Sequence, residues 1–142
     1  MSITGIEKLE FGVEDLPTCE KFMQDFGLQP TLQHWGEPRR EFTTLSGASV
    51  VLYPQDSEVL PAAFEAGSTL RRMTWAVESP AALAALQPLL AQMPGFRHVD
   101  EELECRDPNG MTLRFAVTAQ QPVDLPVSPI NQWGDVRRID QP

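Results

Sequence analysis

The sequence predicts an α+β protein of two tandem βαβββ modules, which together form a curved, partly closed, eight-stranded mixed sheet around a cleft. Three observations predict this fold. An alternating apolar strand pattern occurs twice, 64 residues apart; each copy leads into a helix; and three strand-like segments follow each helix. We expect the modules at residues 1–54 and 69–117, joined by a linker at 55–68 and followed by a proline-rich tail or inter-domain connector at 118–142.

The first strand of each module has an apolar residue at every second position, which is typical of a strand with one buried face. These positions are Leu9, Phe11 and Val13 in the first module and Met73, Trp75 and Val77 in the second. Asp15 and Ser79, also 64 residues apart, are suitable N-cap residues, and a proline follows each within two residues. A helix is therefore expected to begin at both places.

Both predicted helices carry one apolar stripe at helical spacing. The stripes are Cys19, Phe22, Met23 and Phe26 in the first helix, and Leu83, Leu86, Leu90 and Met93 in the second. Gly27 is expected to end the first helix, and Pro94 with Gly95 the second. Pro88 is expected to kink or shorten the second helix, because proline lacks the N–H that the helix needs.

Three strand-like segments follow each helix. They are residues 30–35, 40–45 and 48–53 in the first module, and residues 96–99, 102–106 and 111–117 in the second. Gly47 and the pair Asn109-Gly110 supply hairpin turns, since both residue types accept positive φ. One such module leaves one face of its sheet bare, so two modules side by side are expected to enclose a cleft.

Composition excludes several partners. The net charge of −9 repels phosphate backbones and anionic lipid, so neither nucleic acid nor membrane is an expected partner. No apolar run approaches the roughly 20 residues needed to cross a bilayer, and the first residues have no basic region followed by an apolar stretch. A cytoplasmic location is expected, and Cys19 and Cys105 are expected to be buried free thiols.

Two motifs carry a resemblance to a known superfamily. Residues 6–16 resemble the opening of glyoxalase, bleomycin-resistance and extradiol dioxygenase modules, and residues 107–115 resemble the closing hairpin of those modules. From residue 3 to about 117, the chain therefore resembles the vicinal oxygen chelate superfamily. It looks most like the metal-free N-terminal domain of a two-domain extradiol dioxygenase.

Members of this superfamily often bind a divalent metal through the first and last strands of each module. The positions here that match those ligands are Lys8, Val51, Arg72 and Arg114. Protonated lysine and arginine repel a dication and valine has no donor atom, so we expect neither a metal nor another cofactor in this chain. His34 and His98 match none of the ligand positions and are expected to be surface or half-buried residues.

The resemblance favours a non-catalytic domain of an extradiol ring-cleaving dioxygenase-like protein, whose partner would be a C-terminal catalytic domain. The proline-rich residues 121–129 and the segment that follows them are similar to the connector between the two domains of such enzymes. A tail that is disordered or lies on the surface is the alternative, although Trp133 and Ile139 argue against it, since an unstructured tail gains little from them. Pairing of modules between chains makes a homodimer a further expectation.

A second interpretation is a metal-independent protein that sequesters a small, anionic ligand. The candidate ligand-binding residues share the cleft face and are Lys8, Glu10, Tyr53, Arg72, Thr74 and Arg114. Ser49 and Thr112 could add polar contacts. A structural ion-pair network of the same residues is favoured over a ligand site, because charges that face a cleft must be paired or solvated in any case.

A third interpretation is a metal-independent, epimerase-like or lyase-like enzyme that uses Glu10 or Tyr53 as acid or base. A glutamate beside a lysine is more often an ion pair than a catalytic base, so no catalytic residue is assigned. Two acidic clusters, at residues 56–58 and 100–102, fall in predicted turns and are expected to be solvated surface.

Overall fold

The computed structural model describes residues 2–31 and 38–126. Its eight strands form one open, mixed sheet in the order β2-β3-β4-β1-β5-β8-β7-β6. The strands are β1 (Ile3–Val13), β2 (Gln29–Pro30), β3 (Arg40–Thr43), β4 (Ser49–Pro54), β5 (Thr69–Val77), β6 (Arg97–Val99), β7 (Glu102–Arg106) and β8 (Thr112–Val117). The predicted α+β fold with two βαβββ units is confirmed.

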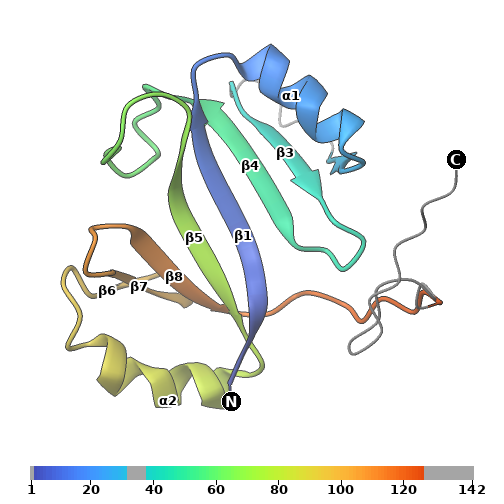
Figure 1. Ribbon diagram of the computed structural model, residues 1–142. Helices are drawn as coiled ribbons and strands as arrows, with labels where there is room; N and C mark the ends of the chain where they lie inside the picture. Colours follow the sequence, from blue (N-terminus) through green and yellow to red (C-terminus); the bar gives the residue numbers. More distant parts are fainter. Residues whose placement is uncertain (1, 32–37, 127–142) are drawn as a thin grey trace, which may run out of the picture.

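The two units meet at the middle of the sheet. The long strands β1 and β5 pair antiparallel there, while β4 pairs parallel to β1 and β8 pairs parallel to β5. Figure 1 shows β1 and β5 side by side at the centre, with α1 (Leu16–Asp25) and α2 (Pro80–Leu90) at opposite ends of the molecule. The repeat in the sequence is therefore a repeat in the topology.

The predicted N-caps of both helices are confirmed. The Asp15 carboxylate accepts hydrogen bonds from the backbone N–H of Thr18 at 3.0 Å and from its hydroxyl at 2.7 Å. These bonds, the backbone one first, hold the pKa of Asp15 below its ordinary value because they stabilise the carboxylate. The Ser79 hydroxyl accepts from the backbone N–H of Ala82 at 3.2 Å.

Helix α2 continues through Pro88 but ends at Leu90, two residues later and before the stop predicted at Pro94 and Gly95. The proline lies near the C-terminal end of the helix, where only one more turn could be lost. The residue four positions earlier, Ala84, is exposed, so its carbonyl can bond to water in place of the missing N–H. Gly27, with a φ of 98°, follows the end of α1 as predicted.

Both helices pack on the same face of the sheet. Helix α1 covers a core cluster that contains Val13, Phe42 and Leu52, and α2 covers a second cluster that contains Val77 and Phe115. Leu9 and Met73 pair across β1 and β5, and they share the faces of Val13 and Val77 by strand alternation. We call this helix-covered side the outer face and the opposite side the inner face.

The strand boundaries differ from the prediction mainly in the first module. Strand β1 begins at Ile3, six residues before the alternating apolar pattern, and β2 is only Gln29–Pro30. Most of the predicted strand at 30–35, with His34, lies outside the described residues. Both cysteines are free: Cys105 is buried, Cys19 is half-buried, and burial raises the pKa of each thiol. Neither described helix has the length and apolar character that a membrane crossing requires.

Candidate functional site

Strand pairing arranges the inner face into two polar rows that run across the sheet. The first row, from β4 to β6, is Ser49, Lys8, Thr74, Arg114, Glu104 and Arg97. The second row, from β4 to β7, is Val51, Glu10, Arg72, Thr112 and Arg106. Five of the six candidate ligand-binding residues therefore lie side by side, and the sixth, Tyr53, lies two residues beyond Val51 on β4.

Glu10 and Arg72 form a buried ion pair at the centre of the second row. The Arg72 guanidinium donates two hydrogen bonds to the carboxylate, Nε to Oε2 at 2.6 Å and Nη2 to Oε1 at 2.7 Å. Glu10 is 4% exposed and Arg72 is 7% exposed. Burial acts to lower the pKa of Arg72, but the hydrogen bond and charge of Glu10 outweigh it and the pKa is raised.

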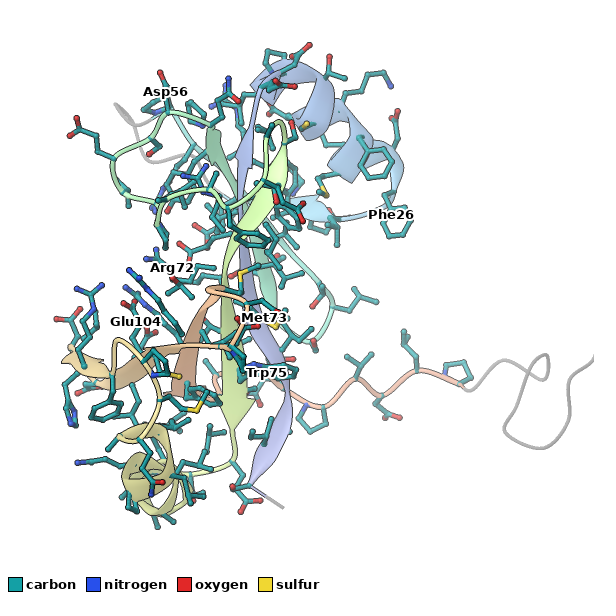
Figure 2. All side chains as sticks on the ribbon, turned by 60° about the vertical axis from the view of Figure 1, so that its left-hand side comes forward. Phe26, Asp56, Arg72, Met73, Trp75 and Glu104 are labelled. Carbon is teal, nitrogen blue, oxygen red and sulfur yellow. The ribbon has the colours of Figure 1, made fainter. Side chains whose placement is uncertain are left out.

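Glu104 connects two arginines in the first row. Its carboxylate accepts from Arg114 Nε at 2.7 Å and from Arg97 Nε at 2.6 Å, while Arg114 also donates to Glu102 at 3.2 Å. Glu104 is buried, which acts to raise its pKa, but the hydrogen bonds and charges of the two arginines outweigh burial and lower the pKa. Figure 2 shows Glu104 and Arg72 on the same side of the sheet.

Lys8 differs from the arginines of the inner face. Its ammonium makes no hydrogen bond or ion pair with any residue in the described part of the chain. Ser49 is its partner on β4 and Thr74 is its partner on β5, and both are buried. A half-buried cation with a hydroxyl-bearing residue on either side is a suitable place for an anionic group.

Tyr53 belongs to a different environment. It is buried with Val51 and with Leu60, a residue between the two modules, in a small apolar cluster on the inner face. Its hydroxyl accepts a long hydrogen bond of 3.5 Å from Arg39 Nη1. Tyr53 lies near enough to Arg72 for its charge to contribute to the raised pKa of that arginine, but it makes no hydrogen bond with Glu10, so the two do not form an acid–base pair.

Solved structures with the same arrangement include a catechol 2,3-dioxygenase, with a TM-score of 0.65 and 18% identity over 85% of this chain and 42% of that chain. The Mn(II)-bound glyoxalase from Novosphingobium aromaticivorans gives a TM-score of 0.62 and 15% identity over 90% of this chain and 43% of that chain. Methylmalonyl-CoA epimerase from Mycobacterium tuberculosis gives a TM-score of 0.53 and 17% identity over 82% of this chain and 89% of that chain.

The chain has the vicinal oxygen chelate fold. It spans about two fifths of the dioxygenase and glyoxalase chains, and most of the epimerase chain. At these identities the likeness concerns the fold alone. No protein-family model matches the sequence, and no curated protein matches it.

The inner face does not fit the divalent metal that members of this superfamily often bind. Arg72 and Arg114 are held by carboxylates, Lys8 is a cation, and Val51 offers no donor atom. Within residues 2–31 and 38–126, no group of three or more histidine, cysteine, aspartate or glutamate side chains could hold a metal ion. The carboxylates of Glu10, Glu102 and Glu104 bind arginines, so they are not available as ligands.

Three residues of the network were missed by the sequence analysis: Glu104, Glu102 and Arg97. The acidic cluster at 100–102 was expected to be solvated surface, and this was wrong for Glu102, which is half-buried against Arg114. A signal was present in the sequence. Glu102 and Glu104 alternate with the apolar residues Leu103 and Cys105, which places both acids on the inner face once β7 is recognised.

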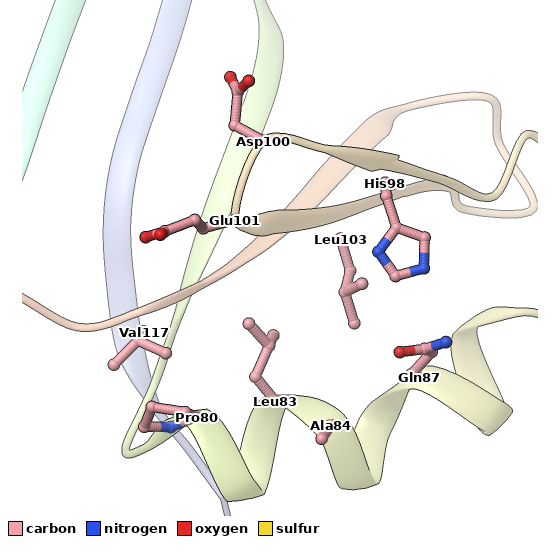
Figure 3. Close-up of a pocket in the computed structure, with 9 residues that line it drawn as sticks. All are labelled: Pro80, Leu83, Ala84, Gln87, His98, Asp100, Glu101, Leu103 and Val117. Atoms are coloured by element: carbon pink, nitrogen blue, oxygen red, sulfur yellow. The ribbon is translucent and has the colours of Figure 1, made fainter.

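A separate hollow lies between α2 and the β6–β7 hairpin (Figure 3). Leu83, Leu103 and Val117 form its apolar floor, and His98, Asp100 and Glu101 lie around it. Leu103 faces the α2 core cluster, so this hollow is not part of the inner face. His98 is exposed, in agreement with the surface position expected for it, and its ring contacts Phe96 edge-on.

Proposed function

We propose that this chain is a metal-free, non-catalytic domain of an extradiol ring-cleaving dioxygenase-like protein, and that a second domain binds the metal and performs the reaction. The observation that carries the proposal is the pair Glu10–Arg72. It occupies the inner face at a superfamily ligand position, and it satisfies both charges internally. An ion pair at this position holds the two central strands together and leaves neither Glu10 nor Arg72 free for acid–base chemistry.

The lengths of the matching structures support a domain role. The dioxygenase and glyoxalase chains are more than twice as long as the part that this chain covers. The segment after β8 also supports it, because Thr118, Ala119 and Gln120 are bound to Glu7 on β1. A connector fixed in this way would extend from this domain at a defined position on the sheet.

The intact mass of the polypeptide purified from its native source tests this proposal. We expect about twice the mass of this chain, since two domains of similar size are implied. The longer polypeptide should cleave a catechol with Fe(II) or Mn(II), while this chain alone with the same metals should not. A native polypeptide that ends at Pro142, or ring cleavage by this chain alone, would overturn it.

A second candidate function is the binding of a small carboxylate, and Lys8 is the observation that favours it. Lys8 lies between Ser49 and Thr74, and no carboxylate of the described residues pairs with it. An ammonium and two hydroxyls can together donate several hydrogen bonds to one carboxylate. This function needs no metal and is compatible with a domain of a larger protein.

Titration with benzoate tests the second candidate. Benzoate should bind the intact chain and benzyl alcohol should not, as measured by calorimetry at low ionic strength. Lys8→Met should abolish binding, whereas Lys21→Met, which removes an exposed lysine from α1, should leave it unchanged. Equal loss in both variants would mean nonspecific attraction and would reject the candidate.

A further inference from the structure

The middle of the outer face is only partly covered by the helices. Helix α1 packs against β3 and β4, and α2 packs against β5, β7 and β8. Between them, a groove of about 640 Å³ lies over β5 and β8. Its apolar lining comes from three segments of the chain and consists of Phe64, Met73, Trp75, Met111 and Leu113. Figure 2 shows Met73 and Trp75 on the side of β5 opposite to Arg72, so this groove is separate from the inner face.

The residues of the groove are unusual for a solvent-facing strand pair. Such a face normally carries polar side chains at alternate positions, yet Met73 and Trp75 are apolar and only half-buried. Phe64, from the segment between the modules, is 49% exposed at the edge. A volume of this size, lined by apolar and aromatic side chains with a few polar groups, has the character of a small-molecule site.

The charge of the groove indicates which ligand it suits. Both charged residues that line it, Glu65 and Asp107, are acids. Asp107 uses Oδ1 to accept from the backbone N–H groups of Asn109 and Met111, so its position is fixed by the turn, and Oδ2 makes no hydrogen bond with the described residues. Glu65 likewise has no ion-pair partner in the described part of the chain.

We propose that this groove binds a hydrophobic organic cation, such as an aromatic quaternary ammonium. The indole of Trp75 can attract the cation through its ring face, the methionine and leucine side chains can bury the apolar part, and Glu65 and Asp107 supply the opposite charge. The net charge of −9 also raises the local concentration of cations. The site does not depend on the function proposed for the inner face.

Benzyltrimethylammonium is a suitable probe for the full chain. Its binding is measured by calorimetry and by shifts of backbone amide signals in NMR spectra. We expect saturable binding, with the largest shifts at Met73, Trp75 and Met111. Phenylacetate and benzyl alcohol, an anion and a neutral molecule of similar shape, should cause no shifts at these groove residues. Binding of all three with similar affinity, or shifts on the inner face instead, would overturn the proposal.

Two matched pairs of variants locate the site. Glu65→Gln should weaken binding by up to about fivefold, the upper end for an exposed ion pair, whereas Glu58→Gln, at an exposed acid of the same segment outside the groove, should not. Met73→Lys should abolish binding and Met73→Leu should retain it. Equal effects of the two glutamate variants would show nonspecific attraction and reject the site. This comparison also decides the matter if Met73→Lys does not fold, because Glu65 is exposed and its variant leaves the core intact.

Discussion

Arg72 and Glu10 face each other across the two central strands, and two hydrogen bonds of 2.6 and 2.7 Å join the guanidinium to the carboxylate. The two residues come from different modules, 62 positions apart. The ion pair therefore connects the halves of the sheet where the central strands of the two modules, β1 and β5, pair with each other. The guanidinium of Arg72 and the carboxylate of Glu10 neutralise each other in this pair, so neither charge is available to a ligand.

Breaking this pair should destabilise the fold. Arg72→Met leaves a buried carboxylate without its partner, which is expected to cost about 3–5 kcal/mol in the free energy of unfolding. The double variant Arg72→Met with Glu10→Met removes both charges and should recover most of that loss. Urea denaturation at pH 7 measures the free energy of unfolding of the unaltered chain, of Arg72→Met and of the double variant.

The exposed pair Lys21–Asp25 on α1 is the control for this experiment. Lys21→Met should cost less than about 1 kcal/mol, because solvent screens the pair. If Arg72→Met were no more destabilising than Lys21→Met, the ion pair would not connect the two modules in the way described here.

Glu104 should make stability depend on pH in the acid range. Its pKa is lowered in the folded protein, so the carboxylate adds stability above the pKa of the unfolded chain. That stability should be lost as the pH falls from about 4.3, the ordinary glutamate value, through the lower folded value. Glu104→Gln should be less stable at pH 7 and should show a shallower fall in acid; identical slopes would contradict the assignment.

Glu7 should hold the segment after β8 against the sheet. Its carboxylate accepts from the hydroxyl of Thr118 at 2.8 Å, the backbone N–H of Ala119 at 3.1 Å and the side-chain amide of Gln120 at 3.0 Å. Glu7→Ala should increase amide hydrogen exchange at residues 118–121 without changing exchange in β5. Glu58→Ala is the control, and equal exchange in both variants would show that Glu7 does not hold this segment.

Sequence reasoning predicted the parts of the fold that depend on local pattern. The caps Asp15 and Ser79 were found because one side chain and the next three residues suffice to define an N-cap. The inner-face positions of Lys8, Arg72 and Arg114 were found because alternation and the 64-residue repeat fix the face of every residue in a strand.

The partners of those residues depend on register, which the pattern alone does not supply. Glu104 faces Arg114 and Arg97 only because β7 pairs with both β8 and β6 in the observed register. Glu10 and Arg72 become partners only after β1 and β5 align across the junction of the modules, with bulges in that pairing. The groove around Met73 was missed for a similar reason, because it depends on where the segment between the modules and the turn between β7 and β8 lie, and not on the strand itself.

Metal content after exposure to Fe(II) or Mn(II) tests the central claim most directly. The purified chain is dialysed without oxygen against each metal, then against metal-free buffer, and the bound metal is counted by mass spectrometry. We predict no stoichiometric metal, because Arg72 and Arg114 occupy ligand positions and hold the nearby carboxylates. One tightly bound equivalent per chain, reduced by Glu10→Gln or Glu104→Gln, would contradict the account.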